Sequence, residues 1–323
     1  MREKIERIDR LMAPVLTDGQ AVELHAVLVA CLMGDGKAAC SKRTTNDYVR
    51  LFLAAKRLEG CSDRSLRYYS STLGRFAVTV PKPAHEMTTD DIRDYLAGYS
   101  RDGRAGKATI DNVRRVISSF FSWMEEEDYI YKSPVRRIKK IRTSRVLKPV
   151  YSDESLEELR DCCVELRDLA MIDLLTSTGI RVGELVQLNR RDIDFEAREC
   201  VVHGKGDKER RVYFDARAKT HLLAYLDERN DDVPALFVSL HRPFKRLQIS
   251  GVEARLRKLG DLAGVKNVHP HKFRRTLATK AIDKGMPIEQ VQVLLGHSKI
   301  DTTLCYAMVD QDNVKRSHRK FIS

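Results

Sequence analysis

The stretch LAMIDLLTSTGIRVGELVQL, from Leu169 to Leu188, predicts two helices separated by a glycine. Gly179 should end the first helix, since glycine readily adopts the left-handed conformation found at helix ends. Arg181 then falls at the start of the next helix, where a guanidinium beside free backbone N–H groups makes a good anion site. Glu184 lies three residues on, within reach of Arg181 or of its backbone. A surface arginine with a nearby acidic partner explains the same residues equally well.

The composition favours a nucleic-acid-binding protein. The chain has 323 residues, enough for about two domains. Its hydrophobic fraction of 42% allows a sizeable core, and its formal net charge is +12 at pH 7. A domain this basic most often meets a polyanion, with nucleic acid as the first candidate. The alternative is a basic surface that has no partner.

The cysteines and the hydropathy indicate a cytoplasmic protein without a metal site. Seven cysteines are scattered, with no CxxC pair and no zinc-type spacing. An odd count and the lack of a signal peptide favour a reducing cytoplasm. No apolar run approaches the roughly 20 residues that span a bilayer, so no membrane partner is expected.

The first half of the chain reads as helical. Residues 1–43 predict an N-terminal helical extension of one or two helices, which would serve as a packing or interaction arm. Residues 44–142 predict an all-helical domain. Its first helix would begin after capping threonines and end at Gly60.

A basic run then marks a boundary. Pro134 and Pro149 bracket it, and Ser152 supplies a new capping signal, so the run reads as an interdomain linker, assigned to residues 143–151. A solvated tether would look similar. Beside a DNA-binding domain, however, such cations more often track phosphates. The candidate DNA-binding residues are Arg136, Arg137, Lys139, Lys140 and Arg142.

Residues 152–323 predict a second domain, mainly α-helical with a small antiparallel β-sheet. ARECVVHGKGDKERRVYFD, from Ala197 to Asp215, alternates polar and apolar residues on both sides of GKGD, which predicts a hairpin. Lys205 would lie at or next to its turn, exposed and mobile. Taken alone, such a lysine is usually just solvated.

A third polar cluster lies in VHPHKFRRTLATKAI, from Val268 to Ile282. Pro270 suits the first turn of a helix. His271 and Arg274 are three residues apart, so they share one helix face and can both donate to a phosphate oxygen. The neighbouring cations could be plain surface charge.

The last stretch is GMPIEQVQVLLGH, which predicts a short helix started by Pro287 and closed by Gly296, with His297 directly after it. A further helix, capped by Asp301, would carry Tyr306 at its end. The same region also has the look of a helix–turn–helix, which a simple DNA-binding regulator would show. Such a regulator would not need the Arg, Lys, His and Tyr set.

The segments TGIRVGEL, GKGDKER, HPHKFRRTLAT and LLGHSKIDTTLCYA, in this order, resemble the tyrosine recombinase family of phage-type integrases and chromosome-dimer resolvases. The resemblance runs from about residue 44 to the end and is strongest from 176 to 310. It implies a two-domain clamp around duplex DNA, made of a helical core-binding domain and a tyrosine-recombinase catalytic domain.

The resemblance also implies the roles of individual residues. Glu184 would support the first arginine, and Tyr306 would be the nucleophile. His269, Phe273 and Arg275 depart from the usual family residues, but none stands at a catalytic position. The catalytic set implied by the resemblance is Arg181, Lys205, His271, Arg274, His297 and Tyr306.

The implied reaction is site-specific cleavage and rejoining of DNA through a 3′-phosphotyrosine, without metal or cofactor, to integrate or excise a mobile element. The expected partners are double-stranded DNA, further copies of the chain in a tetramer on DNA, and accessory directionality or bending factors. The segment after Tyr306 would dock on a neighbouring protomer. The alternatives are a chromosome-dimer resolvase, a catalytically idle DNA-binding regulator on the same fold, and a topoisomerase of related chemistry.

Overall fold

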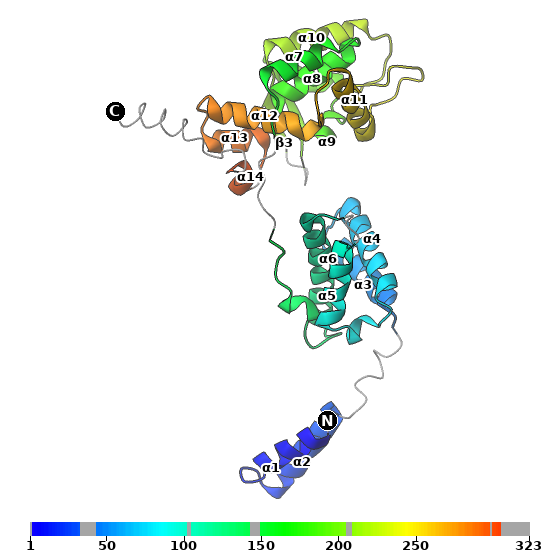
Figure 1. The fold of residues 1–323 in the computed structure, drawn as a ribbon, viewed down its shortest axis with the longest axis vertical. Helices are drawn as coiled ribbons and strands as arrows, with labels where there is room; N and C mark the ends of the chain where they lie inside the picture. The colour runs from blue at the N-terminus through cyan, green and yellow to red at the C-terminus, as the bar shows by residue number, and fades with distance from the viewer. Residues whose placement is uncertain are drawn as a thin grey trace, which may run out of the picture. The chain divides into compact units, whose positions relative to one another are not determined.

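The computed structural model describes residues 2–32, 43–101, 105–142, 149–204, 209–297 and 299–304. These residues are mainly helical and contain one three-stranded antiparallel sheet, which confirms the fold class expected from the sequence. The chain divides into two compact units, Met1–Val146 and Leu147–Ser323, and each is described by itself (Figure 1). Lys205, Tyr306, the tail and most of the predicted linker lie outside the described residues.

The first unit begins with two helices that lie side by side, α1 (Arg2–Met12) and α2 (Asp18–Leu32) (Figure 1). Ile5 of α1 is buried, and the Asp9 carboxylate lies 2.6 Å from Nδ1 of His25 on α2. The described residues of the extension therefore form two helices, as the apolar spacing of the sequence predicts.

Four helices build the core of this unit, and side-chain caps stabilise the starts of several of them. Thr44 and Asp47 form a reciprocal capping box at the start of α3, and Thr88 and Asp91 pair in the same way before α5. Aromatic rings then fill the interior. The elements are α3 (Thr45–Leu58), α4 (Asp63–Thr79), η1 (Ala84–Glu86), α5 (Thr89–Arg101), α6 (Lys107–Glu126) and η2 (Pro134–Arg137), and the buried aromatic residues include Tyr48, Phe52, Phe76, Phe120, Phe121 and Trp123.

The start of the basic run belongs to this helical core and is not a tether. Pro134 begins η2, and its carbonyl accepts a hydrogen bond of 2.8 Å from Thr89 Oγ1. Val135, Ile138 and Ile141 pack against the core, so every third residue of this charged segment is an apolar anchor. Residues 134–142 therefore pack with the helical domain expected over residues 44–142, although the bracketing prolines begin within it. The basic side chains between the anchors remain exposed.

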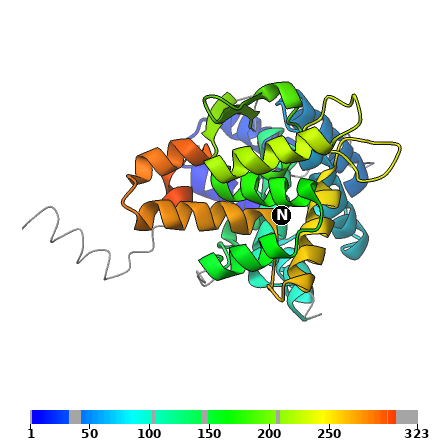
Figure 2. The ribbon, with the colours of Figure 1, turned by 90° about the horizontal axis from the view of Figure 1, so that it is seen from above.

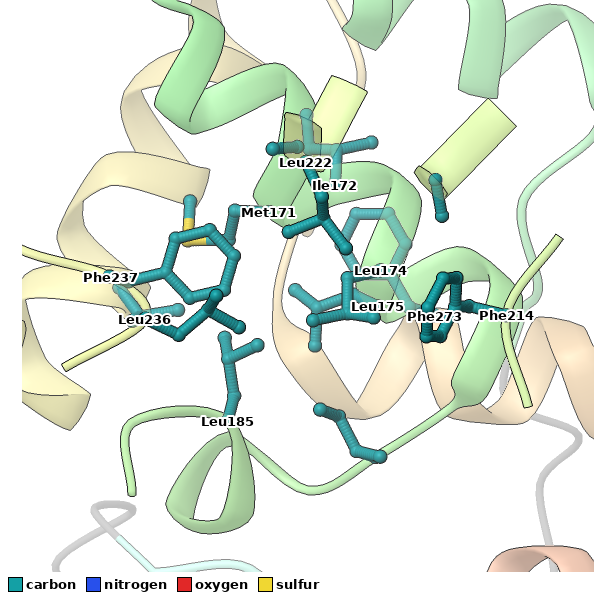
Figure 3. Close-up of a cluster of buried hydrophobic side chains, with 14 of the residues drawn as sticks. Met171, Ile172, Leu174, Leu175, Leu185, Phe214, Leu222, Leu236, Phe237 and Phe273 are labelled. Atoms are coloured by element: carbon teal, nitrogen blue, oxygen red, sulfur yellow. The ribbon is translucent and has the colours of Figure 1, made fainter. Parts of the chain in front are cut away.

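The second unit is built around α8, which is buried along most of its length. α8 ends at Thr178, and Gly179 takes the expected left-handed conformation with φ 59°. Figure 3 shows Met171, Ile172 and Leu175 of this helix surrounded by apolar side chains from other elements. The helices of the unit are α7 (Asp153–Asp161), α8 (Leu166–Thr178), α9 (Val182–Leu185), η3 (Arg190–Asp192), α10 (Ala216–Glu228), α11 (Ile249–Leu262), α12 (Pro270–Asp283), α13 (Ile288–Leu295) and α14 (Ile300–Leu304).

The sheet has the order β1 (Ile193–Asp194), β2 (Glu199–His203) and β3 (Glu209–Tyr213). His203 pairs with Glu209, so β2 and β3 form the predicted hairpin, and residues 204–208 connect its strands. Lys205 belongs to this connection. Val212 of β3 is buried and Arg210 shares its face of the strand, because side chains on a strand alternate.

The last three helices gather together, as both ribbon views show (Figures 1 and 2). Ala278 of α12 packs against Val291 and Leu295 of α13. α13 begins after Pro287 and ends at Gly296 with φ 63°, as expected. α14 begins at Ile300, one residue before the expected cap at Asp301, so Asp301 lies within the helix.

The chain enters the second unit at a residue fixed to α12. The backbone N–H of Tyr151 donates to Thr276 Oγ1 at 2.9 Å, and the Tyr151 hydroxyl accepts from the backbone N–H of His269. The Tyr151 ring packs on Phe273, and Lys272 Nζ lies 4.1 Å from its centroid. The start of the second unit is thereby held against α12 by a buried aromatic residue.

Substitution of Gly260 in α11 should destabilise the second unit. An added Cβ would lie 2.6 Å from Val268 Cγ2 and 2.9 Å from the backbone oxygen of Val265. We expect Gly260→Ala to lower the free energy of unfolding by about 1–3 kcal/mol, measured by urea denaturation. Gly251→Ala in the same helix is the matched control, because it meets only the tip of the Leu247 side chain. Equal stability of the two variants would contradict this packing.

Candidate active site

Glu184 is the buried centre of a charged cluster in the second unit. Its side chain is 4% exposed and pairs with both Arg181 and Arg210. Arg210 donates from Nη1 and Nη2 to the two carboxylate oxygens, each at 2.7 Å, while Arg181 donates from Nη1 at 2.9 Å and from its backbone N–H at 2.8 Å. Burial alone would raise the pKa of Glu184, but these hydrogen bonds hold it below its ordinary value. The carboxylate therefore stays ionised between two guanidiniums.

Arg181 occupies the N-cap position of α9, as the sequence predicts. Because α9 has only four residues, its dipole adds little, and the side chain supplies most of the positive charge. About a third of that side chain is exposed, so it remains accessible to a ligand.

Arg274 lies deeper than Arg181. It is 3% exposed, donates from Nη1 to the Gly179 carbonyl at 2.9 Å, and donates from Nη2 to the Leu295 carbonyl. It thus joins the end of α8 to the end of α13. Gly179 leaves room for the apolar side chains around this contact, since an added Cβ would lie 2.8 Å from Leu277 and 3.3 Å from Leu295.

Three arginines from separate elements meet at the carboxyl end of α13. Arg210 Nε donates to the Leu294 carbonyl at 3.3 Å, and Arg274 Nη2 donates to the Leu295 carbonyl. Arg181 Nη2 donates to the Gly296 carbonyl at 3.1 Å. The last carbonyls of a helix have no partner within the helix and carry its negative dipole end, so cations stabilise them. The helix end thus gathers the guanidiniums in one place, where an anion would meet all of them.

His271, on α12, lies in the field of this cluster. Partial burial lowers its pKa from the ordinary value, and the charges of Arg274, Arg181 and Arg275 lower it further. A neutral imidazole beside guanidiniums can accept a proton at pH 7. His271 and Arg274, three residues apart on α12, are thus close enough for the guanidinium charge to act on the imidazole.

His297 follows the α13 cap directly. Its Nδ1 lies 2.9 Å from the hydroxyl of Thr303, a fully buried residue of α14. Burial, followed by the charges of Arg274, Arg181 and Arg210, lowers the pKa of His297 to about 4. Three of the residues predicted as a site, Arg181, Arg274 and His297, therefore gather with Glu184 around the carboxyl end of α13. His271 lies within electrostatic reach of Arg181 and Arg274.

The two remaining predicted residues, Lys205 and Tyr306, lie outside the described part of the chain. Their flanking elements are nevertheless fixed. Lys205 belongs to the connection between β2 and β3, and β3 carries Arg210 of the cluster. Tyr306 lies two residues beyond Leu304, the last residue of α14, and this helix holds Thr303 against His297.

The basic residues chosen as DNA-binding candidates lie in the first unit, on the segment anchored by Val135, Ile138 and Ile141. All five of their side chains are exposed. Arg136 lies 3.8 Å from Glu125, a distance that leaves it only weakly paired. The exposed set is Arg136, Arg137, Lys139, Lys140 and Arg142.

A basic and aromatic hollow between α4 and α6 was not found from the sequence. Arg64 and Tyr68 of α4 face it, together with Asn112 and Arg115 of α6. Cations beside an aromatic ring and an amide suit a nucleic acid, since they offer phosphate contacts, stacking and base-edge hydrogen bonds. The arginines stand in separate helices, so no local charge run marked them.

Arg210 was missed as well, although the sequence held a signal. It stands two residues before Val212, on the inward face of a strand whose pattern predicts an apolar residue there. A charged residue on an inward strand face needs a buried partner.

Among the described residues, no group of three or more His, Cys, Asp and Glu side chains could hold a metal ion. No helix in the described ranges is long and apolar enough to cross a membrane.

Comparison with known proteins gives two family matches. Residues 150–313 match the phage integrase family, and residues 48–130 match the SAM-like N-terminal domain of phage integrases. The chain is 30% identical over 293 residues to the tyrosine recombinase XerC of Oceanobacillus iheyensis, covering 84% of this chain and 95% of the relative. It is 31% identical over 270 residues to the tyrosine recombinase XerA of Thermococcus onnurineus, covering 81% and 91%.

Solved structures share the fold. The XerH site-specific recombinase bound to a palindromic difH substrate matches with a TM-score of 0.68 and 20% identity, covering 99% of this chain and 95% of that one. A lambda integrase dimer bound to a COC′ core site matches with a TM-score of 0.68 and 18% identity, covering 90% and 87%.

The environment of His297 predicts an unusual titration. The folded protein should keep this imidazole neutral down to a pKa of about 4, whereas an ordinary histidine titrates near 6.5. Because the unfolded chain binds the proton at the higher pH, acidification between these values should destabilise the fold. NMR titration of the imidazole signals, with His297→Gln to assign the peak, measures the midpoint. A midpoint at the ordinary value would contradict the burial and the arginine field.

Proposed function

The chain belongs to the tyrosine recombinase family, and from this premise we propose that it is a site-specific DNA recombinase that cleaves and rejoins strands through a 3′-phosphotyrosine. The observation that carries the proposal is the convergence of Arg181 and Arg274 at the carboxyl end of α13, directly before His297. The charges of both arginines also act on His271. A phosphodiester repels nucleophiles because it is already negative. Guanidiniums aimed at its non-bridging oxygens offset the charge that develops in the transition state.

The proposed reaction begins with Tyr306. Its phenolic oxygen attacks phosphorus, forms the phosphotyrosine bond at the 3′ side, and displaces the 5′ oxygen of the next nucleotide. His271, kept neutral by its surroundings, takes the phenolic proton, and Lys205 gives a proton to the departing 5′ oxygen. His297 donates to the phosphate from the turn after α13. A 5′-hydroxyl from another strand then reverses the step, so neither ATP nor metal is required.

Arg181 and Arg274 have separate parts in this scheme. Arg181 is partly exposed and held by Glu184, which suits a direct contact to the scissile phosphate. Arg274 is buried and anchored by two backbone carbonyls, so its guanidinium plane is fixed before DNA binds. The supporting role of Glu184 follows from its hydrogen bonds to Arg181 and to Arg210.

The proposed DNA contacts in the first unit are of two kinds. The exposed cations from Arg136 to Arg142 would track phosphates, because they flank apolar anchors and face solvent. The hollow between α4 and α6 would meet the groove and base edges through Arg115 and Asn112. A DNA substrate also agrees with the cytoplasmic location expected from the sequence.

Two substrates fit this activity. One is a mobile element that is integrated or excised, which was the first expectation, and the other is a chromosome dimer that is resolved. Strand exchange between two duplexes needs four cleavages, so we propose a tetramer on DNA, assisted by accessory factors that bend DNA or set direction. Recombination assays with element ends and with chromosomal sites, run side by side, distinguish the two substrates.

The covalent intermediate supplies the test of the proposed function. We expect the full chain to form a protein–DNA adduct on a nicked suicide duplex carrying the DNA ends found beside the gene, seen on a denaturing gel. Tyr306→Phe should give no adduct, because it removes the attacking oxygen. Tyr213→Phe, at a tyrosine of β3 that is 55% exposed, is the matched control and should react normally. An adduct with Tyr306→Phe would assign the nucleophile to another residue, and tight binding without any adduct would favour the idle regulator.

The hollow between α4 and α6 gives a binding prediction. Arg115→Ala should raise the Kd for the duplex about five- to tenfold and reduce the slope of log K against log salt by about one. Arg93→Ala on α5, an exposed residue 2.8 Å from Asp90, is the control and should leave both quantities unchanged. Fluorescence anisotropy at several salt concentrations measures them. An unchanged salt slope with Arg115→Ala would remove this arginine from the DNA contacts.

A further inference from the structure

Arg210 is the member of the arginine cluster that the reaction described above does not use. It stands on β3, and its side chain is 11% exposed, whereas 36% of the Arg181 side chain is exposed. Its neighbour Arg211 points to the other face of the strand, where it is 67% exposed and pairs with Glu199 at 2.8 Å. Two adjacent arginines of one strand therefore have opposite environments.

The hydrogen bonds of Arg210 are directed inward. Nη1 and Nη2 bind the two oxygens of Glu184, and Nε binds the Leu294 carbonyl. A planar guanidinium bound to both oxygens of a carboxylate fixes its plane as well as its position. Glu184 in turn binds the Arg181 side chain and backbone, so the orientation of Arg181 depends on that plane.

Burial makes this support necessary. A carboxylate that is 4% exposed is costly unless it is fully paired. Arg181 alone could neutralise it, but a second guanidinium frees Arg181 to donate to the Gly296 carbonyl and to face solvent. Arg210 thus supplies the pairing that an exposed, ligand-facing Arg181 cannot supply by itself.

Arg210 also contacts the turn that precedes His297. An added Cβ on Gly296 would lie 2.7 Å from Arg210 Cδ and 3.1 Å from its Nε. The side chain therefore passes against a glycine that also has a positive φ of 63°, and the turn and the arginine fix each other's position. Lys205 lies five positions earlier in the chain, in the connection that leads into the same strand.

We propose that Arg210 is a positioning residue for DNA cleavage, which orients Arg181 through Glu184 and ties β3 to the turn before His297 without contacting DNA itself. This inference rests on the proposed recombinase function. It assigns to one side chain the alignment of two segments that carry proposed catalytic groups, namely the start of α9 with Arg181 and the α13–α14 turn with His297. Misplacement of a catalytic group by about 1 Å can cost about 100-fold in rate.

The test compares cleavage with binding. Single-turnover adduct formation on the suicide duplex gives the rate, and anisotropy gives the Kd, for the full chain and its Arg210→Gln, Arg210→Lys and Arg211→Gln variants. We expect Arg210→Gln to cleave about 100-fold more slowly. The Kd of Arg210→Gln should stay within about twofold of wild type. The cleavage rate and the Kd of Arg211→Gln should also stay within about twofold of wild type. Arg210→Lys, which keeps the charge but loses the planar fork, should recover part of the rate.

A double variant tests the route through Glu184. If Arg210 acts in part through that carboxylate, Arg210→Gln combined with Glu184→Gln should lose less rate than the two single losses multiplied together. The double variant removes the buried Glu184 carboxylate together with its partner Arg210. Circular dichroism and thermal denaturation show whether Arg210→Gln folds. If it does not fold, the double variant and Arg210→Lys are the variants used in the test.

The outcomes separate the inference from the proposed function. A wild-type rate for Arg210→Gln, or for Arg210→Lys where only that variant folds, would overturn the inference alone. So would a variant that binds DNA weakly yet cleaves normally at saturation, because Arg210 would then be a DNA contact. Fully additive losses in the double variant would also overturn it. A wild-type chain that binds the duplex but forms no adduct would overturn the proposed function, and the inference with it.

Discussion

The carboxyl end of α13 organises the second unit. Its last carbonyls have no partner within the helix, and arginines from the start of α9, from α12 and from β3 donate to them. Because the three arginines come from elements far apart in sequence, the folded unit has to be complete before they meet. The site is therefore a property of the whole unit. Gly296 matters because it allows the end of α13 to approach Arg210, whereas Gly179 makes room for the side chains of Leu277 and Leu295.

The same geometry bears on the helix–turn–helix alternative. α12 and α13 do pack as two short helices with a turn between them. In a regulator of that kind the second helix would present its surface to DNA and its end would need no internal partners. Here the end of α13 is occupied by guanidiniums from within the unit, and His297 follows it with a lowered pKa. These features are expected of a site for an anion and not of a recognition helix.

Local rules explain what could be predicted from the sequence. Gly179, Pro270 and Gly296 mark helix ends that depend on a few neighbouring residues, and the structure has them where the sequence indicates. Arg210 could not be found in this way, since its partner Glu184 is 26 residues distant and the contact depends on how β3 packs. The charge of the basic run likewise obscured its apolar anchors, because Ile138 and Ile141 stabilise that segment only once the helical core exists. Lys205 and Tyr306 remain predictions made from the sequence.

The choice of anchors for the arginines has an electrostatic consequence. Four of their hydrogen bonds end on backbone carbonyls, those of Gly179, Leu294, Leu295 and Gly296, which hold a guanidinium without cancelling its charge. Glu184 pairs with Arg181 and Arg210 and offsets part of their positive charge. Carbonyl anchors leave the rest of that charge available to an anion. In the proposed reaction it would stabilise the additional negative charge that a phosphodiester acquires when a phenolate adds to it.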